Sequence, residues 1–398
     1  YAAGGARFTG YGIDMNTVDG WSLRHLIISG AATAVKLFQS DDMLVEWVRA
    51  LDGSVGVDIS TSYRSVFRHC ALAGNSTYGL YQNNGYNTDW NHGVVWSNTY
   101  GFYMYGGSLT VENTVIGSFG AGRYAYYYRE RSTTDVFACD YNNIYLASGA
   151  YAGFLDASAG DDYDVVYETA SRWIRDFGVD QHSLSHDPLF ADAGSRDFHL
   201  KSPAGRYEAG AGCVTNAAET ASPLIDAGNP ASDYADEPSP NGARINIGLY
   251  GNSDQASKSP TNSVLTAVSL SSGGRVEGLS DLIWVASGDV TGHTVTIEYS
   301  ADGGQTWTTL VSGVAAALNI WSWDTTLVQD SVLGQWRITS EVDASVSDIN
   351  DVLFAVRNAP IDFYVNDLST SGDIYSTAVG NSTNNGLSAA TPQTSLQY

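Results

Sequence analysis

Basic residues and long apolar runs are both scarce in this sequence. Lysine and arginine together number 19 against 43 acidic residues, which leaves a formal net charge of −24, and only three of the basic residues are lysines. A chain with this charge repels nucleic acids and anionic membrane surfaces. It also contains no run of about 18 apolar residues that would suit a bilayer-spanning segment. We therefore expect no nucleic-acid partner and no membrane insertion, and the many Asp, Asn, Ser and Thr residues favour a secreted protein.

Cysteine is scarce too, which limits the ways in which the fold can be held together. The 398 residues include three cysteines, Cys70, Cys139 and Cys213. A disulfide framework needs a denser set, and a structural zinc site needs ligands at short spacing. We predict buried free thiols at Cys70 and Cys139. The chain shows neither an initiator Met nor a signal peptide, so we expect a mature fragment or an excerpt of something longer.

A repeat of about 22 residues dominates the first third of the chain. Its copies begin with the strings GIDM, AVKL, GVDI, GLYQ, GFYM and AYYY, at positions 12, 34, 56, 79, 101 and 125. The first position is always Gly or Ala, and the second and fourth positions are mostly apolar. The second position holds Ile13, Val35, Val57, Leu80, Phe102 and Tyr126, and the fourth holds Met15, Leu37, Ile59, Gln82, Met104 and Tyr128. Alternation of period two predicts a strand with one buried face, and its recurrence predicts a stacked solenoid.

We predict that this solenoid is a right-handed parallel β-helix. Each coil would supply two or three short strands and stack about 4.8 Å from the next coil. A second strand can be followed at the same spacing through Leu26 and Ile28, Val48 and Ala50, Cys70 and Leu72, and Gly93 and Val95. The Leu-x-x-Leu-x-Leu frame of a leucine-rich repeat is absent. The predicted fold class is all-β, with a β-helix over 1–215, a closing segment and linker over 216–260, and a β-sandwich after them.

The sequence from 178 to 259 carries a second signal. Its strings GVDQHSLSHDPLF, RDFHLKSPAGRYEAG and SPLIDAGNPASDYADEPSPNGARINIGLYGNSDQASKS resemble the closing region of secreted right-handed parallel β-helix repeat proteins. Such proteins occur among large bacterial surface and exported proteins and are distantly related to polysaccharide lyases. The matching residues are Asp180, His182, Ser183, Asp187, Pro188, Phe190, Asp197, Phe198, Leu200, Ser222, Pro223, Ile225, Asp226, Gly228, Pro230, Glu237, Pro238, Asn241, Gly242, Arg244, Ile245, Asn246, Gly248, Tyr250 and Gly251. The resemblance covers roughly residues 1–259 and implies a fold rather than an activity.

Two interpretations of this closing region stay open. In the first, it caps the last coil, and Asp226, Glu237 and Arg244 satisfy buried backbone groups there, because an open β-helix end would recruit other strands. In the second, Asp233, Asp236 and Glu237 hold a calcium ion, since hard cations bind clustered carboxylates. Apart from this calcium interpretation we expect no cofactor. Just before the region, ETASRWIRDFG (168–178) is the best helix candidate in the chain.

Residues 261–359 show a different pattern, which follows a Ser/Pro/Asn-rich linker. Seven short alternating runs resemble an immunoglobulin- or fibronectin-like sandwich without its disulfide. Within them, SADGGQTW (300–307) matches the Asp-box pattern of sialidase propellers. We interpret this single copy as a structural hairpin in which Asp302 bonds the turn backbone, Gly303 or Gly304 has a positive φ, and Trp307 packs beneath.

The last residues, 360–398, resemble the opening of another β-helix of the same broad family. A first strand, a Gly/Asn-rich turn and an Asn-Gly-Leu-Ser…Pro…Ser-Leu-Gln stretch lead into the first coil in that family. We expect this segment to dock on the next unit, either within a tandem array or by head-to-tail strand addition between subunits. The residues assigned to this contact are Phe363, Tyr364, Val365, Leu387 and Leu396.

The third position of the repeat is predicted to point outward, and its first three copies are charged. They are Asp14, Lys36 and Asp58. A lysine between carboxylates resembles the base of a β-helix polysaccharide lyase. However, flanking acids raise a lysine pKa, which is wrong for a base, and the further carboxylates of such a site are missing. We therefore assign no catalytic residue, and a cross-strand charge ladder is the simpler interpretation.

The next three copies of the same position are Tyr81, Tyr103 and Tyr127. Stacked phenols suit a sugar-binding surface, a subunit contact or a purely structural stack, and all three interpretations stay open. His25, His69 and His92 recur at a similar interval on the second strand, and we interpret them as surface residues of the repeat without a metal or catalytic role.

Two classes of function follow from these observations. The first is a structural or adhesive repeat unit of an extracellular fibre or large cell-surface protein, without enzyme activity, whose partners are copies of itself. It accounts for the repeat, the sandwich and the tail. The alternative is a secreted carbohydrate-binding or polysaccharide-lyase-like protein with a polysaccharide partner, which rests on the fold resemblance and the tyrosines alone.

Overall fold

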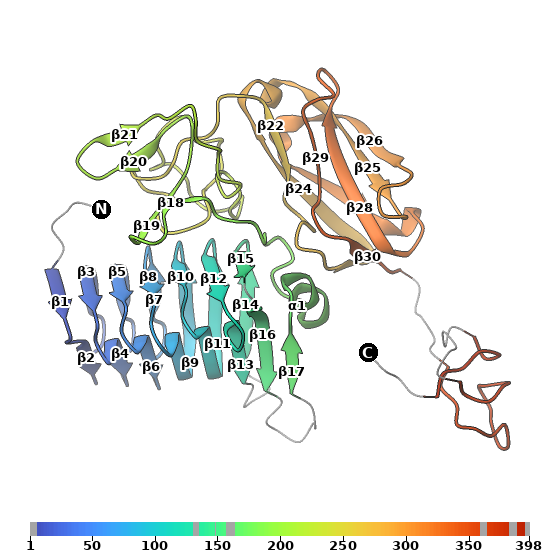
Figure 1. Cartoon of the computed structure of the whole chain (residues 1–398), viewed down its shortest axis with the longest axis horizontal. Coiled ribbons are helices and arrows are strands. Elements are labelled where there is room, and N and C mark those ends of the chain that lie inside the picture. Colours follow the sequence, from blue (N-terminus) through green and yellow to red (C-terminus); the bar gives the residue numbers. More distant parts are fainter. Residues whose placement is uncertain are drawn as a thin grey trace.

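The computed structural model describes residues 6–129, 135–147, 149–156, 164–358, 364–381 and 388–394. Its parts are a stack of strands, a loop-rich layer along one side of that stack, a β-sandwich, and a small lobe of residues 364–381 and 388–394 (Figure 1). The fold class is therefore all-β, as predicted. The described part of the chain contains a single α-helix, α1 (Ala170–Phe177), and no described helix is long and apolar enough to cross a membrane.

The stack is a solenoid of about six turns whose strands pair in parallel with their equivalents in the next coil. Its first face carries the repeated strings. The strands of this face are β2 (Ile13–Asn16), β4 (Thr33–Phe38), β6 (Val55–Ser60), the first parts of β9 (Tyr78–Asn91) and β11 (Tyr100–Glu112), β13 (Tyr124–Arg129) and β16 (Tyr151–Asp156). Residues of the second and fourth repeat positions pair in the predicted register from Ile13 and Met15 to Tyr126 and Tyr128.

Two further faces complete each coil. The strands that form them are β1 (Ala6–Thr9), β3 (Ser22–Ser29), β5 (Leu44–Leu51), β7 (Val66–Arg68), β8 (Ala71–Ala73), β10 (Val94–Trp96), β12 (Val115–Phe119), β14 (Val136–Asp140) and β15 (Asn143–Ala147). Leu26 pairs with Val48, and Ile28 with Ala50, so the predicted second strand is confirmed. The spacing stays near 22 residues as far as β12, where Val94 pairs with Val115, and then loosens, since Val115 pairs with Asn143.

The lumen of the solenoid is apolar and is bordered by polar ladders at its corners. Val35, Leu37 and Ile59 are fully buried, and the thiols of Cys70 and Cys139 are buried as predicted. At one corner Asn98 Oδ1 accepts from Asn75 N at 2.9 Å and from Asn75 Nδ2 at 3.0 Å, and Asn98 Nδ2 donates to Leu72 O at 2.9 Å. Such amides satisfy backbone groups that the turn between strands would otherwise leave unpaired.

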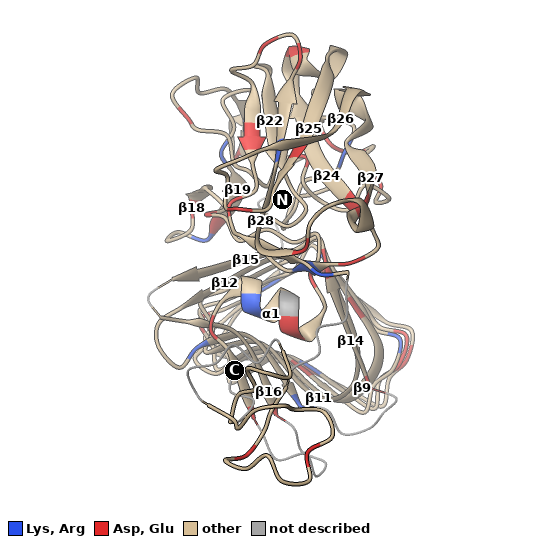
Figure 2. Cartoon of the chain, turned by 90° about the vertical axis from the view of Figure 1, so that its right-hand side faces the viewer, with Lys and Arg blue, Asp and Glu red and all other residues tan. Residues whose placement is uncertain are grey.

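Helix α1 forms where the sequence predicts it. The side chain of Thr169 accepts from Arg172 N, and Gly178, with φ 82°, ends the helix by donating its N–H to Ile174 O. These are an N-cap and a left-handed C-terminal glycine of the usual kind. Figure 2 looks at this end of the molecule and shows α1 lying across the mouth of the solenoid.

The helix closes the last coil with an aromatic plug. Trp173 is fully buried, and its ring lies 5.2 Å from that of Tyr126, the last ring of the lumen column, and 4.4 Å from that of Phe177. Its indole N–H donates to Asp180 Oδ2 at 3.0 Å. Burial raises the pKa of Asp180 to about 6, against the hydrogen bonds from Asn142, Ser183 and Trp173.

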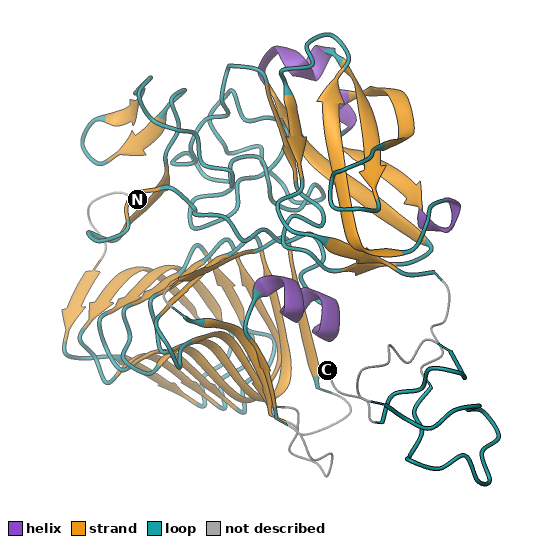
Figure 3. Ribbon diagram, turned by 45° about the vertical axis from the view of Figure 1, so that its right-hand side comes forward, coloured by secondary structure: helices purple, strands orange, loops and turns teal. Residues whose placement is uncertain are grey.

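Only the start of the closing region continues the solenoid. On the first face, parallel stacking ends at β16, which pairs antiparallel with β17 (Val165–Tyr167), well before position 215. On another face Leu184 pairs in parallel with Asn143 of β15, and its carbonyl accepts from Ile144 N at 2.8 Å. The chain from there to 259 covers the side of the solenoid and not the last coil, contrary to our expectation, and Figure 3 shows mostly loops in this layer. Its short strands are β18 (Phe190–Asp192), β19 (Asp197–Leu200), β20 (Arg206–Glu208) and β21 (Gly212–Val214). Residues of β8, β10 and β12 that point outward are apolar, so this face needs a cover.

The same layer satisfies buried backbone groups, as the first interpretation of the closing region proposed. Arg244, which is 2% exposed, donates to the carbonyls of Ala227, Gly228 and Trp284. Glu237 Oε1 accepts from the backbone amides of Asn246 and Asn252, both at 2.9 Å. Because Trp284 belongs to the sandwich, the layer also joins the solenoid to that domain.

The sandwich consists of two sheets that pack around buried tryptophans. One sheet contains β22 (Val264–Ala267), β24 (Leu279–Ser287) and β27 (Ile320–Asp324); the other contains β23 (Arg275–Val276), β25 (Thr294–Ser300), β26 (Thr308–Ala315), β28 (Ser331–Ser340), β29 (Ser347–Ile349) and β30 (Phe354–Val356). Three short 3-10 helices, η1 (Gly288–Gly292), η2 (Ala316–Leu318) and η3 (Thr325–Leu327), lie between strands. Trp284, Trp323 and Trp336 are at most 1% exposed and form the core.

The hairpin between β25 and β26 confirms the structural interpretation of SADGGQTW. Asp302 Oδ1 accepts from the backbone amides of Gln305 and Thr306, and Gly303 and Gly304 have φ of 71° and 84°. The indole N–H of Trp307 donates to Gly304 O at 3.1 Å. The hydrogen bonds that Asp302 accepts, first of all the one from the Thr306 hydroxyl, lower the pKa of its carboxyl to about 2.

Candidate functional site

The most extensive side-chain array on the solenoid is a set of eight aromatic residues on its first face, which we call the tyrosine face. An inner row continues the predicted column: Tyr81, Tyr103, Tyr127 and Phe154. An outer row lies three residues earlier on each strand: Tyr78, Tyr100, Tyr124 and Tyr151. All eight are half-buried. The structure therefore brings the three predicted tyrosines together and adds five rings to them.

The two rows differ in the direction of their rings. The rings of Tyr103 and Tyr127 are 4.4 Å apart and 8° from parallel, and those of Tyr127 and Phe154 are 4.6 Å apart at 15°, so these three rings of the inner row are stacked face to face. The ring of Tyr81 is tilted by 31° from that of Tyr103. The rings of Tyr100 and Tyr124 are parallel to each other within 4° but stand at 88° and 87° to that of Tyr127. The outer row therefore stands edge-on to the inner row, and its neighbouring rings are stacked or tilted toward one another.

Burial raises the pKa of four phenols of this face and keeps them neutral at physiological pH. Burial, and then the neighbouring tyrosines, raise the pKa of Tyr103 to about 12 and also raise that of Tyr127. Burial likewise raises the pKa of Tyr78 and Tyr124 in the outer row. Neutral hydroxyls both donate and accept hydrogen bonds, so the face offers a ligand aromatic surface and polar edges together.

The charged part of the same column is a plain cross-strand ladder. Lys36 lies in register between Asp14 and Asp58, and its ammonium is 5.9 Å from the centroid of the Phe38 ring. Lys36 has no ion pair within 4.0 Å in the described part of the chain. Burial raises the pKa of Asp58, although the Ser60 hydroxyl donates to it at 2.9 Å. Nothing in this arrangement activates the lysine as a base.

Of the three histidines of the second strand, His25 is exposed as predicted, but His69 and His92 are buried, so the interpretation of these two as surface residues is wrong. His69 and His92 are 8% and 9% exposed, because the side layer covers them. His69 Nδ1 lies 2.9 Å from Leu249 O, and its ring stacks between Trp47 and His92 at 4.3 and 5.2 Å. Burial lowers the pKa of His69 and lowers that of His92 to about 3. Both imidazoles are neutral packing groups.

The three carboxylates considered for calcium do not converge. Glu237 is 5% exposed and uses Oε1 to hold two backbone amides, whereas Asp233 and Asp236 are exposed. Asp233 Oδ1 accepts from the Ala235 amide of its own turn. In the residues that the structure describes, no group of three or more His, Cys, Asp or Glu side chains is close enough to hold a metal ion.

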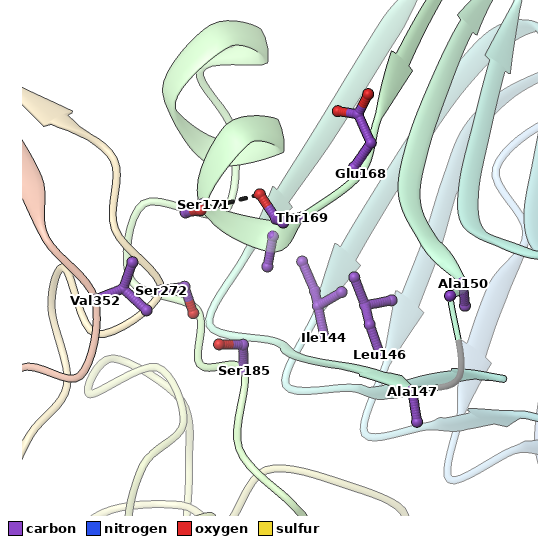
Figure 4. Close-up of a pocket in the computed structure, with 12 residues that line it drawn as sticks. Ile144, Leu146, Ala147, Ala150, Glu168, Thr169, Ser171, Ser185, Ser272 and Val352 are labelled. Carbon is purple, nitrogen blue, oxygen red and sulfur yellow. Dashed lines mark hydrogen bonds between the residues drawn. The ribbon is translucent and has the colours of Figure 1, made fainter. Parts of the chain in front are cut away.

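A cleft of about 490 Å³ lies where the last coils, α1 and the sandwich meet (Figure 4). Ile144 and Leu146 of β15 line one side, and Thr169 and Ser171 at the start of α1, with hydroxyls 3.0 Å apart, line another. Glu168, at its rim, forms an ion pair with Arg172 at 2.5 Å. This cleft is a seam between domains and contains no arrangement of nucleophile and base among the residues drawn in Figure 4.

The predicted assembly segment lies only partly within the described residues. Tyr364 and Val365 are described, whereas Phe363, Leu387 and Leu396 lie outside the described ranges. Val365 pairs in parallel with Gln393, and Gln393 N donates to Tyr364 O at 2.9 Å. Large apolar side chains of this lobe are open to solvent: Leu368, Ile374 and Tyr375 are 81%, 84% and 80% exposed.

The comparison with known protein families agrees with the stacking of these coils. Residues 6–119 match the family model described as a right handed beta helix region. This part of the chain is a right-handed β-helix. The match begins at β1 and ends with β12, so it covers the coils that keep the most regular spacing. No curated protein matches the chain.

The sequence analysis missed the outer row of the tyrosine face. Its signal was present, since Tyr78 and Tyr100 stand directly before the glycine of their copies and Tyr124 before the alanine. Treating the position before the first repeat residue as a further column of the β-helix would have found it. Arg7 and Arg49, on the outer face of the first coils, could not be singled out in this way, because they meet residues from 195 to 255 only in the folded chain.

Proposed function

We propose that this chain is a structural repeat unit of an extracellular or cell-surface protein, in which units join head to tail. The tail lobe, which the structure describes over 364–381 and 388–394, would complete the first β-helix coil of the next unit. The observation that carries this proposal is a pair of complementary, incompletely covered ends. The same contact would form whether the adjoining unit belongs to the same polypeptide or to another copy.

The first coil supplies one of these ends. Within the described residues β1 pairs only with β3 and β2 only with β4, so each keeps one open edge. The lumen residues Ile13 and Met15 are only partly buried, and Tyr11 and Trp21 nearby are 78% and 60% exposed. An open parallel edge with apolar surroundings is a template for a further strand.

The tail lobe supplies the other end. Val365 and Gln393 pair in parallel across 28 positions, and the β-helix uses the same separation between Val115 and Asn143. The lobe thus already contains one coil-like pairing. Figure 1 shows it on the opposite side of the molecule from β1, beyond α1 and the sandwich. Because α1 blocks the last coil, the next unit is added through the tail lobe and not by direct stacking on that coil. A head-to-tail contact of this kind repeats without closing and produces filaments.

Two full-length variants test this proposal. The head variant carries Tyr11→Asp and Trp21→Asp, the tail variant carries Val365→Asp, and a control carries Leu327→Asp at an 81%-exposed position of the sandwich. Sedimentation velocity over a range of concentrations should show oligomers for the unmodified chain and the control, and monomers for each variant. Mixing the two variants should yield a 1:1 dimer and nothing larger, since one intact head then meets one intact tail.

The outcome that would refute assembly is equally specific. An unmodified chain that remains monomeric at all accessible concentrations contradicts the proposal. Oligomers that persist in both variants contradict the assigned surfaces, because a buried aspartate at an apolar contact costs several kcal/mol. Circular dichroism of each variant establishes that the fold is retained.

A second function is favoured by the outer row of the tyrosine face. The rings of Tyr78, Tyr100, Tyr124 and Tyr151 follow one another at 5.4, 5.7 and 5.1 Å along the β-helix, and all four are only half-buried. Sugar rings pack on exposed parts of such side chains through their apolar sides while their hydroxyls bond the phenols. We propose that an extended polysaccharide binds along this row.

Affinity electrophoresis with neutral polysaccharides tests this second function. Tyr100→Ala and Tyr124→Ala should each weaken retardation of the full chain, whereas Leu327→Ala, at an 81%-exposed position of the sandwich, should not. Equal retardation of all three variants would show that the tyrosine face has a structural role only.

A further inference from the structure

A pocket of about 250 Å³ lies where the outer face of the first three coils meets the side layer. Arg7 of β1, Ile27 of β3 and Arg49 of β5 occupy one register position in successive coils and form its floor. The side layer closes it with His199 of β19 and Gln255, among others. This pocket is separate from the tyrosine face, which lies on the first face of the coils.

The pocket is locally basic in a chain that is otherwise acidic. Arg7, Arg49 and Arg196 all line it, although the whole chain has only 19 basic residues. Arg196 is paired with Asp52 at 2.5 Å, and its carbonyl accepts from Arg49 Nη2. Asp197 is paired with His199. In the described structure, Arg7 and Arg49 form no ion pair, so their charge is available to a ligand.

Three buried polar atoms of the lining have no hydrogen-bond partner in the described part of the chain. They are Arg49 Nε, His199 Nε2 and Gln255 Oε1. His199 and Gln255 are 6% and 8% exposed. Each such atom costs about 1–3 kcal/mol if it stays unpaired. Their presence together in one basic pocket indicates that a bound group satisfies them.

The chemistry of these atoms defines that group. Arg49 Nε is a donor. His199 Nδ1 lies 2.5 Å from Asp197 Oδ1 and donates to that carboxylate, so Nε2 is the ring nitrogen left for a ligand. The forked N–H groups of Arg7 and Arg49 match the two oxygens of a carboxylate, and His199 Nε2 suits a hydroxyl beside it. The amide of Gln255 offers either an acceptor or a donor after rotation, which suits a neighbouring hydroxyl. Asp197 in the lining disfavours a multiply charged anion.

We propose that this pocket binds the carboxylate of a small hydroxylated acid of the sugar-acid class. Its volume of about 250 Å³ is below the roughly 300–1,000 Å³ of sites for drug-sized molecules, so it accepts a single ring. The stacked rings of His199 and Tyr250, 3.7 Å apart, hold the imidazole in place. This site is independent of the head-to-tail contact proposed above.

Calorimetric titration of the full chain tests the proposal with sodium glucuronate, glucose and sodium acetate. Glucuronate should bind, and glucose should bind at least about tenfold more weakly because it lacks the charge. Arg49→Gln and Arg7→Gln should each weaken glucuronate binding by about tenfold or more. Arg24→Gln is the matched control, since Arg24 is an exposed arginine on β3 that pairs with Glu46 outside the pocket.

Each result has a defined meaning. Acetate that binds more weakly than glucuronate, with the same dependence on Arg49, assigns the site to a sugar acid, whereas equal affinity assigns it to simple carboxylates. No binding of glucuronate at millimolar concentration overturns the proposal, as does binding that neither arginine variant changes. Tighter binding of sodium sulfate than of glucuronate overturns the assignment to a carboxylate. Arg7 is exposed, so its variant stays informative even if Arg49→Gln fails to fold.

Discussion

Replacing Trp173 with alanine should open the end of the β-helix that α1 closes. Trp173 is fully buried, and its ring contacts Tyr126, Phe177 and the lumen residues around them. Removal of a buried tryptophan costs about 3–5 kcal/mol through lost apolar contact and the remaining cavity. The loss should be concentrated in the last coils, because each coil of a solenoid contacts only its neighbours.

A second variant separates the two roles of this side chain. Trp173→Phe keeps most of the ring but leaves Asp180 Oδ2 without the indole N–H that now lies 3.0 Å away. An unpaired buried acceptor costs about 1–3 kcal/mol. Since the lost bond favours the charged carboxylate, and burial already raises the pKa of Asp180 to about 6, this deficit should be larger at pH 8 than at pH 5.

Hydrogen exchange read by mass spectrometry, together with urea unfolding, measures these effects. In Trp173→Ala the amides of β13 and β16 should lose protection, while those of β25 and β28 in the sandwich should not. Leu327→Ala is the control, because Leu327 is 81% exposed on the sandwich and its removal should cost less than about 0.5 kcal/mol. A Trp173→Ala protein whose exchange and unfolding midpoint equal those of Leu327→Ala would refute the assignment of α1 as the cap.

Three further predictions concern single sites. Gly107→Ala should destabilise the protein far more than Gly122→Ala in calorimetric unfolding. Both glycines have a positive φ, which costs a residue with a side chain about 1–2 kcal/mol. In addition, a Cβ at Gly107 would lie 1.9 Å from a carbonyl oxygen, whereas Gly122 faces open space. Glu237→Gln should stabilise the chain at pH 8 and lose this advantage toward pH 4.5. Burial raises the pKa of Glu237 from 4.5 to about 8, so as pH rises the unfolded state ionises first and the free energy of unfolding of the native chain falls. Equal melting temperatures of the variant and the native chain at pH 8 would contradict this. Asn98→Ala should cost at least about 2 kcal/mol, since it leaves two buried donors of Asn75 without their acceptor, and a denaturation midpoint unchanged from the native chain would exclude the ladder as a stabilising feature.

Much of the fold could be predicted because the repeat carries its own register. A strand with one buried face and a fixed period has only one way to stack, so the alignment of Ile13 with Val35 and Val57 followed from the strings alone. The end of α1 at Gly178 and the hairpin at Asp302 were likewise local problems of capping and turn chemistry. Neither depended on what the rest of the chain does.

The errors arose where burial is decided by distant residues. His69 and His92 recur on the outside of the coils, where a repeat places solvent-facing groups, and only the side layer makes them neutral core residues. We expected the same layer at the end of the β-helix. The sequence alone does not indicate that the apolar outer face of β8, β10 and β12 has a greater need of a cover than the last coil has. Clustered carboxylates near Asp233 pointed to calcium for a similar reason, since proximity in sequence did not make their oxygens converge.

What the sequence by itself determined is the parallel β-helix, its register, its helix and its sandwich, because periodicity, capping and turns act over short distances along the chain. Tertiary structure alone decided that α1 rather than the closing region plugs the last coil, that two rows of aromatic rings share one face, and that Arg7 and Arg49 meet His199 in one pocket. These contacts depend on which surfaces remain apolar or unpaired once the coils have stacked. Local sequence patterns do not predict this, because it depends on residues far apart in the chain.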